Sequence, residues 1–188
     1  GLPTTQVPLV LEGGSLDVDG LGLGLPTEQC LLNPTRNPGL QRPAIERLVK
    51  DAYGLEKLLW LGDGLLNDHT DGHIDNLARF VNDRTVVTPL PPDSPDFRIL
   101  KNSFEVIPLP SPKITGPDGP LPASYANFYI ANGVVLLPVF GVREDEEALR
   151  VLHSLFPNRR LVPILSRDLV LGFGGIHCVT QQEPSPAT

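Results

Sequence analysis

Short hydrophobic runs bounded by Gly, Pro or Asp recur along the chain and predict a series of buried β-strands. The residues at the ends of these runs favour turns, so each run forms a short element of its own. The predicted strands cover residues 7–11, 58–61, 85–88, 128–130, 134–140, 161–165 and 169–171.

Two longer segments show apolar residues at helical spacing. In the first, Pro43 stands near the start and Gly54 follows the end, where these two residue types favour a helix. In the second, acidic residues fill the first turn and Pro157 ends the helix. The predicted helices cover residues 42–53, 143–156 and, over a shorter length, 73–81. Because strands alternate with amphipathic helices, we expect an α/β fold.

Residues 89–122 interrupt this alternation. They contain ten of the 21 prolines, and the Pro-Leu-Pro-Ser-Pro run at 108–112 excludes a helix or an interior strand. Since the hydrophobic pattern is alike on both sides, we expect a functional or covering loop within one domain rather than a linker.

Composition narrows the class of protein. A length of 188 residues, 40% of them hydrophobic, suffices for one well-packed domain or two small ones. The mean hydropathy is −0.02, and no apolar run approaches the roughly 18 residues of a membrane span, which argues against a membrane protein. A net charge of −7 disfavours a nucleic-acid-binding surface and suits a small cationic substrate.

The two cysteines, Cys30 and Cys178, do not make a disulfide framework, so we expect a reducing, cytoplasmic compartment. Cys30 is expected to be an ordinary buried residue. Cys178 differs because a glycine-rich turn at 172–175 precedes it and His177 is its neighbour. Glycines let the backbone approach a ligand closely, so Cys178 is a candidate nucleophile. The alternative is a second small buried side chain.

Two further clusters carry reactive side chains. Glu12 ends the first predicted strand before two glycines, so its carboxylate faces either a cleft or an ordinary surface turn. Residues 67–76 contain two histidines and three aspartates, which can supply a base, an orienting carboxylate and cation-binding groups. His69 and His73 have the spacing of zinc ligands on one helix face, although Gly72 favours a turn that separates them. A third alternative is that the aspartates cap a helix and the histidines are solvated.

Five segments, spread in order over nearly the whole chain, form one pattern. They are residues 12–14 (Glu-Gly-Gly), 32–38 (Leu-Asn-Pro-Thr-Arg-Asn-Pro), 70–76 (Thr-Asp-Gly-His-Ile-Asp-Asn), 125–132 (Tyr-Ala-Asn-Phe-Tyr-Ile-Ala-Asn) and 176–182 (Ile-His-Cys-Val-Thr-Gln-Gln). This pattern closely resembles the agmatine deiminases, which belong to the bacterial-type peptidyl-arginine deiminases of the guanidino-group-modifying superfamily. The resemblance implies a pentein-type α/β propeller of ββαβ modules around a pseudo-fivefold axis, with the active site in the central channel.

The resemblance also implies the chemistry. Cys178 would attack the guanidinium carbon as a thiolate, and His73 would act as the general acid and base. Asp75, in the Gly-His-x-Asp motif, would bind the substrate guanidinium, and Glu12 is a candidate for a second such carboxylate. The expected reaction converts agmatine to N-carbamoylputrescine and ammonia in polyamine biosynthesis, without a metal or an organic cofactor.

The chain departs from the family pattern in three respects. Gly175 stands where members usually carry Asn, and Phe173 interrupts the glycine run before the cysteine. An Arg-Asp motif that supplies a further guanidinium-binding Asp has no counterpart before Leu11, and family chains are close to twice as long. The chain has no methionine and starts at Gly1. We therefore expect residues 1–188 to be the C-terminal portion of one catalytic domain, with about three of five modules.

The sequence leaves alternatives open. A deiminase acting on free or peptidyl arginine, or an amidinotransferase, shares the implied fold and chemistry. A metal-dependent hydrolase at His69 and His73, or a non-catalytic fragment that binds a partner, belongs to another class. We expect a small cationic guanidino substrate, expect neither nucleic acid nor membrane as a partner, and leave a homo-oligomer open.

Overall fold

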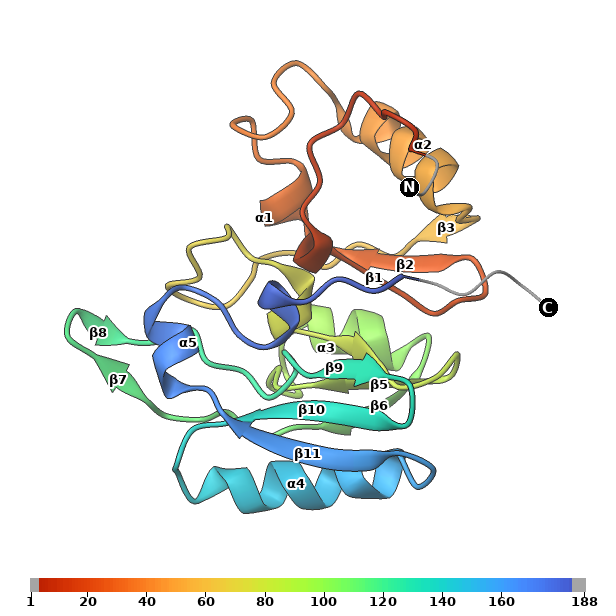
Figure 1. Ribbon diagram of the computed structural model, residues 1–188. Helices are drawn as coiled ribbons and strands as arrows, with labels where there is room; N and C mark the ends of the chain where they lie inside the picture. Colours follow the sequence, from red (N-terminus) through yellow and green to blue (C-terminus); the bar gives the residue numbers. More distant parts are fainter. Residues whose placement is uncertain (1–3, 184–188) are drawn as a thin grey trace.

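The computed structural model describes residues 4–183, which form three small three-stranded sheets that follow one another in chain order (Figure 1). The first sheet consists of β1 (Leu16–Val18), β2 (Leu23–Pro26) and β3 (Lys57–Leu58). The second consists of β4 (Arg79–Phe80), β5 (Thr85–Thr88) and β6 (Glu105–Pro108). The third consists of β9 (Tyr129–Ala131), β10 (Val134–Val139) and β11 (Arg160–Leu165). A separate hairpin pairs β7 (Thr115–Gly116) with β8 (Gly119–Pro120).

Each three-stranded sheet has the same ββαβ order. Its first two strands are antiparallel, and its third strand is parallel to the second. A parallel pair needs a crossover connection, and here a helix supplies it. The three crossover helices are α2 (Arg42–Tyr53), α3 (Pro95–Lys101) and α4 (Glu144–Leu155). Two shorter helices are additions to this repeat: α1 (Glu28–Leu31) precedes α2 in the first crossover, and α5 (Arg167–Leu171) follows the third unit. The expected α/β class is therefore confirmed.

The hydrophobic core is divided among the three units. One cluster of buried side chains centres on α1, α2 and the first sheet, and includes Leu31, Ile45 and Val49. A second includes Leu77, Val86 and Leu100. The third and largest packs α4 against the third sheet; it includes Phe128, Leu137 and Leu152.

Buried Arg79 connects all three units. It is 5% exposed and extends from β4 of the second unit. Its Nε lies 2.9 Å from Oδ1 of Asp17 in β1, and its NH1 donates to the carbonyl oxygen of Phe128 at 2.8 Å, just before β9. The guanidinium also stands 4.9 Å from the centre of the Phe128 ring, within the range of a cation–π interaction.

Several elements agree with the sequence pattern. Helix α2 has the predicted bounds, and β5 has the predicted residues 85–88. The predictions at 128–130, 134–140, 143–156 and 161–165 correspond to β9, β10, α4 and β11 with ends shifted by one residue. Of 58–61, only Leu58 belongs to β3, while Leu61 makes an isolated bridge with Thr27.

Other predictions were wrong. Residues 7–11 form no strand, because Val10 bonds instead to the side chain of Asn37. Residues 169–171 end helix α5, so this short apolar run belongs to a helix, in which only Val170 is buried. Residues 73–81 contain a 3-10 turn (Ile74–Asn76) followed by β4 instead of one helix. Residues 89–122 are not a loop throughout, since they hold α3 and β6, which pairs with β5.

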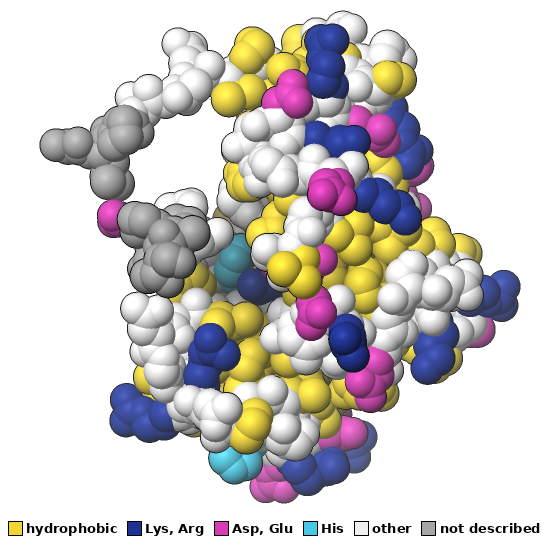
Figure 2. Space-filling model, turned by 90° about the vertical axis from the view of Figure 1, so that its right-hand side faces the viewer, with side chains coloured by type: hydrophobic (Ala, Val, Ile, Leu, Met, Phe, Trp, Pro, Cys, Tyr) yellow, Lys and Arg dark blue, Asp and Glu magenta, His cyan; other side chains and the backbone are white. Residues whose placement is uncertain are grey.

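The surface carries exposed hydrophobic side chains. Figure 2 shows a broad hydrophobic area on one face, interspersed with carboxylates and Lys or Arg side chains. The most exposed large hydrophobic residues include Leu21, Leu66 and Leu165. None of the helices formed by residues 4–183 has the length and apolar character that crossing a membrane requires.

Candidate active site

Most residues of the candidate site lie at equivalent places in the three ββαβ units, directly before the first strand of each, whereas Cys178 follows the third unit. Glu12 and Gly14 precede β1, His73 and Asp75 precede β4, and Asn127 precedes β9. The 3-10 turn at Gly13–Ser15 contacts both the turn at Ile74–Asn76 and a third turn, His177–Val179. These turns bring together residues that are far apart in the sequence.

The first turn needs glycine because other side chains crowd it. A Cβ atom on Gly14 would lie 2.5 Å from Oδ2 of Asp75 and 2.6 Å from Nδ1 of His73. No real Cβ tolerates such distances, so the Glu-Gly-Gly segment lets the backbone of the first unit approach the polar groups of the second.

Cys178 lies with its sulfur against polar groups, although the residue as a whole is exposed. Nδ2 of Asn127 donates to Sγ at 3.3 Å, and the thiol faces Oδ2 of Asp75 at 3.6 Å. Desolvation by burial raises the pKa of the thiol, and the Asp75 carboxylate raises it further, whereas hydrogen bonds from Gly175 and Asn127 lower it. In the free protein the neutral thiol is therefore favoured.

Asp75 is 1% exposed and joins the turn that contains Cys178 to the second unit. Its Oδ2 accepts a hydrogen bond from Nδ1 of His177 at 2.8 Å. Its Oδ1 is buried and has no hydrogen-bond partner among the described residues. A buried carboxylate oxygen without a donor is costly, so Asp75 is prepared to accept a donor from a bound molecule.

His73 and Glu12 face each other on another side of the site. Nε2 of His73 lies 3.9 Å from Oε2 of Glu12, which is too long for a hydrogen bond, and within residues 4–183 this buried nitrogen has no partner. Glu12 in turn accepts from Nε of Arg36 at 2.7 and 3.0 Å. The protein's own guanidinium thus already binds the carboxylate that was expected to contribute to substrate binding.

His69 is separated from this group. Its ring contacts Phe173 edge-on, with the ring centres 4.2 Å apart, and it borders a different cavity from His73. In the part of the chain that the structure describes, no cluster of three or more metal-ligating side chains includes His69. The structure does not support a metal site at His69 and His73, because the turn at Gly72 separates the two imidazoles as its position suggested.

Three of the four expected residues line a cavity of about 340 Å³, and Asp75 is not among its lining residues. Glu12, His73 and Cys178 line it together with Phe173 and His177. Phe173 is 62% exposed and has a φ of 69°, a conformation that favours glycine. The cavity is large enough for a small organic molecule.

Sequence reasoning assigned no role to Asn127, Arg36 or His177. Asn127 and Arg36 each lie in a segment of the recognised pattern, which was the available signal. Only the structure shows that Asn127 bonds to the Cys178 sulfur, that Arg36 fixes Glu12 and that His177 fixes Asp75.

Comparison with known proteins identifies the family. The profile of the Porphyromonas-type peptidyl-arginine deiminases matches residues 1–184. Agmatine deiminase of Pseudomonas putida is 38% identical over 212 residues, which cover 94% of this chain and 58% of that protein. The structure of agmatine deiminase of Enterococcus faecalis superimposes with a TM-score of 0.87 at 36% identity, covering 94% of this chain and 58% of that one. A C. jejuni agmatine deiminase with substrate bound gives a TM-score of 0.83 at 31% identity, over 92% and 56% of the two chains.

The chain is shorter than these relatives in two ways. It spans less than two thirds of their length. The aligned region of 212 residues also exceeds the 188 residues of the chain, so the relative has internal segments that this chain lacks. The matched segments nevertheless run from the first residue to beyond Cys178. The chain belongs to the Porphyromonas-type peptidyl-arginine deiminase family.

Proposed function

We propose that the protein is a cysteine-dependent guanidine deiminase that hydrolyses agmatine to N-carbamoylputrescine and ammonia. One observation carries the proposal: the Cys178 thiol lies 3.6 Å from Asp75, whose second carboxylate oxygen is buried without a donor. A planar guanidinium is rich in N–H donors, so binding at Asp75 presents its carbon to the sulfur.

Binding of the cation also activates the nucleophile. The Asp75 carboxylate helps to raise the pKa of Cys178, and a guanidinium at Asp75 offsets this charge and lowers the pKa again. The thiolate then forms a bond to the guanidinium carbon, and the C–N bond to an amino group breaks. His73 donates the proton with which ammonia leaves, and an amidino-cysteine intermediate remains.

Water completes the reaction. His73, now neutral, accepts one proton from water as the water oxygen bonds to the amidino carbon. The S–C bond then breaks, and the second proton of the water returns to the sulfur, so that N-carbamoylputrescine and the Cys178 thiol are released. In this scheme Glu12, 3.9 Å from Nε2 of His73, stabilises the protonated imidazole, and His177 positions Asp75.

The rest of the proposal concerns the whole protein. We propose that the three ββαβ units are three modules of a five-module pentein propeller, and that residues 1–188 form the C-terminal portion of its catalytic domain. A further guanidinium-binding Asp would come from the part that the relatives have and this chain lacks. With agmatine as the substrate, we also propose a cytoplasmic location and a role in putrescine synthesis.

A deiminase of arginine is the second candidate, because the family is described as peptidyl-arginine deiminases. The cavity favours agmatine over free arginine. The side chains lining it within the described region include Glu12 but neither Lys nor Arg, so the α-carboxylate of arginine finds no permanently charged cation there. A peptidyl arginine has no free α-carboxylate, so the lining of the cavity does not distinguish it from agmatine.

The test is turnover of agmatine, L-arginine and a blocked arginine amide, measured as ammonia and ureido product. We expect agmatine to be the best of the three, Cys178→Ala to abolish turnover, and His73→Ala to reduce kcat by roughly 100-fold or more. Turnover that survives Cys178→Ala and disappears with a chelator would instead establish a metal hydrolase. A folded protein that turns over none of the three would establish a non-catalytic fragment.

A further inference from the structure

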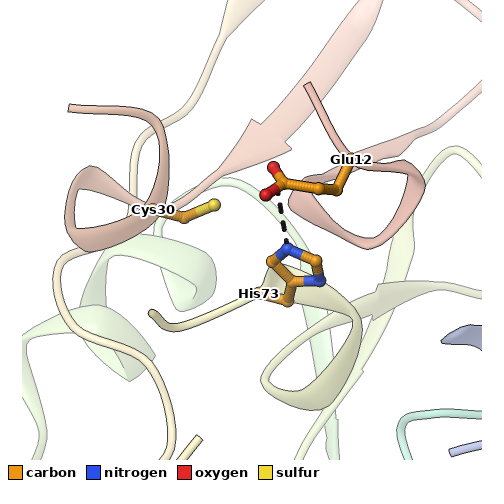
Figure 3. A group of neighbouring side chains, drawn as sticks. All are labelled: Glu12, Cys30 and His73. Carbon is orange, nitrogen blue, oxygen red and sulfur yellow. Dashed lines mark ion pairs between the residues drawn. The ribbon is translucent and has the colours of Figure 1, made fainter. Parts of the chain in front are cut away.

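Three potential metal ligands of different chemistry meet beside the active-site cavity. The side chains are Glu12, Cys30 and His73, and one ligand atom from each lies within 4.8 Å of the other two. They come from separate segments: the turn before β1, helix α1 and the turn before β4 (Figure 3). Cys30 has no part in the reaction proposed above.

The imidazole is the second, independent sign of a ligand. His73 is 6% exposed, and its buried Nε2 has no hydrogen-bond partner in the described part of the chain. This nitrogen points towards the Glu12 carboxylate but stops at 3.9 Å (Figure 3). A buried ring nitrogen without a partner is costly to maintain. In the neutral imidazole with its proton on Nδ1, the lone pair of Nε2 is suited to bind a cation.

A sulfur, a nitrogen and a carboxylate oxygen form the donor set that Zn²⁺ prefers, with bonds of about 2.0–2.3 Å. Tetrahedral geometry places such donors roughly 3.3–3.8 Å apart, so the three side chains need to close by about 1 Å. Three protein ligands leave the fourth position open. Glu12 and His73 line the cavity of about 340 Å³, which supplies a route for the ion.

The surroundings select against hard cations. Arg36 donates to both oxygens of Glu12, which fixes the carboxylate and adds a positive charge that Mg²⁺ or Ca²⁺ would have to overcome. A thiolate ligand binds soft ions well and hard ions poorly, so it offsets the unfavourable charge of Arg36 only when the bound ion is soft. Burial raises the pKa of Cys30 to about 12, so the thiol is protonated near neutral pH and a metal has to displace its proton.

We propose that Glu12, Cys30 and His73 form an inhibitory site for Zn²⁺ or a similar thiophilic divalent cation. Binding replaces the S–H bond of Cys30 with an S–Zn bond and releases one proton to solvent. The ion takes the lone pair of His73 Nε2, so the imidazole can no longer transfer protons. Inhibition rests on the proposed function of His73, whereas metal binding does not.

Co²⁺ is the spectroscopic probe, used with the full chain carrying Cys178→Ala so that the nucleophile cannot bind it. We expect one equivalent of Co²⁺ to bind with a sulfur-to-cobalt charge-transfer absorption, Zn²⁺ to displace it, and affinity to increase with pH. Adding Cys30→Ala or Cys30→Ser should remove the absorption. It should also weaken Co²⁺ binding more than about 100-fold, because loss of a residue that only supports a ligand already costs roughly 10–100-fold in metal affinity. Circular dichroism checks that each variant is folded.

Inhibition is measured separately with Cys178 intact. We expect Zn²⁺ to inhibit agmatine turnover and Cys30→Ala, active in the presence of a chelator, to resist it. The proposed site is overturned if the Cys178→Ala protein shows no sulfur-to-cobalt absorption. It is also overturned if the absorption persists after Cys30 is replaced, because the metal is then bound by other ligands. If the wild-type protein turns over no agmatine but binds Co²⁺ through Cys30, the proposed function fails and the metal site stands.

Discussion

At the scale of single residues, Asp75 is the group on which the others converge. One of its oxygens contacts both His177 and the Cys178 thiol, and the other is buried without a partner among residues 4–183. The Asp75 carboxylate therefore disfavours ionisation of the Cys178 thiol. Under the proposed function, the same carboxylate would bind the substrate cation, which would offset this effect.

This arrangement predicts how the thiol reacts with pH. In a Cys30→Ala background, the rate of Cys178 alkylation by iodoacetamide should rise with a midpoint above the ordinary thiol pKa of 9.0, because burial and Asp75 raise the pKa. Asp75→Asn should shift the midpoint downward and accelerate the reaction at neutral pH. Asp71→Asn, which alters an exposed carboxylate bonded to Arg36, is the control and should leave it unchanged. A midpoint at or below 9.0 in the parent would contradict this reasoning.

The position of Phe173 predicts that its replacement changes substrate binding more than the chemical step. It lines the cavity near Cys178 but donates no polar group. Phe173→Gly should raise the KM for agmatine about fivefold, the equivalent of about 1 kcal/mol of lost apolar contact, with little change in kcat. Its φ of 69° suits glycine, so the free energy of unfolding should not fall as it does when a core aromatic residue is truncated. Phe173→Leu, which keeps an apolar side chain, should show a smaller rise; a fall in kcat alone would refute this role.

The sequence drew attention to Cys178, His73 and Asp75 because they stand in short segments that resemble the family pattern. The structure places the thiol of Cys178 3.6 Å from the Asp75 carboxylate, and the catalytic and binding roles expected of the three residues stay predictions. The partner of Glu12 was not predictable, because Arg36 is 24 residues away and joins it only through the fold. The link between His177 and Asp75 spans 102 residues, and no local pattern encodes a contact of that kind.

At the scale of secondary structure, α2 is the element that its own residues define most completely. Pro43 stands in its first turn, Ile45 and Val49 are buried, and Gly54 ends it with a φ of 65°. The N–H of Gly54 bonds to the carbonyl oxygen of Lys50, and a left-handed residue at this position is the usual way to end a helix.

Gly54→Ala should lower the free energy of unfolding by about 1 kcal/mol, because alanine is strained at this φ. No described atom lies within 4 Å of the added Cβ, so the cost is backbone strain without a clash. Gly54→Asn should cost less, since asparagine tolerates the left-handed region. Urea unfolding curves of the three proteins measure the difference. A stabilised alanine variant would show that the helix does not end in this conformation.

Elements that depend on distant partners were harder to predict. The bounds of α2 were correct because its start, buried side and end are all local signals. Strands β4 and β6 were missed, because their pairing with β5 and not their composition makes them strands. A short apolar run such as 169–171 cannot be assigned to a helix or a buried strand from its pattern alone, and its placement in α5 depends on tertiary context.

At the scale of the whole molecule, Arg79 is the link among the three units. It bonds to Asp17 in the first unit and to the backbone before β9 in the third. The side chain of Arg79 is buried and that of Asp17 is 13% exposed, so removal of one leaves a largely uncompensated charge.

Arg79→Met should therefore lower the free energy of unfolding by roughly 3–5 kcal/mol. The matched control is Arg84→Met, which removes an arginine with an 88% exposed side chain that pairs with Asp83; its cost should not exceed about 0.5 kcal/mol. Combining Arg79→Met with Asp17→Asn should cost less than the sum of the single changes. If the loss of unfolding free energy in the double variant equals the sum of the two single losses, Arg79 and Asp17 do not couple the units.

The meeting of Cys178 with residues of the second and third units also has a consequence for folding kinetics. Each ββαβ unit closes through contacts between nearby residues, whereas the contacts of Cys178 with Asn127 and Asp75 join residues 51 and 103 positions apart. Closure of such long loops is slow relative to local pairing. After dilution from denaturant, the helical signal should return in an early phase, and protection of the Cys178 thiol should follow in a later one, so that the nucleophile reports the last step of assembly.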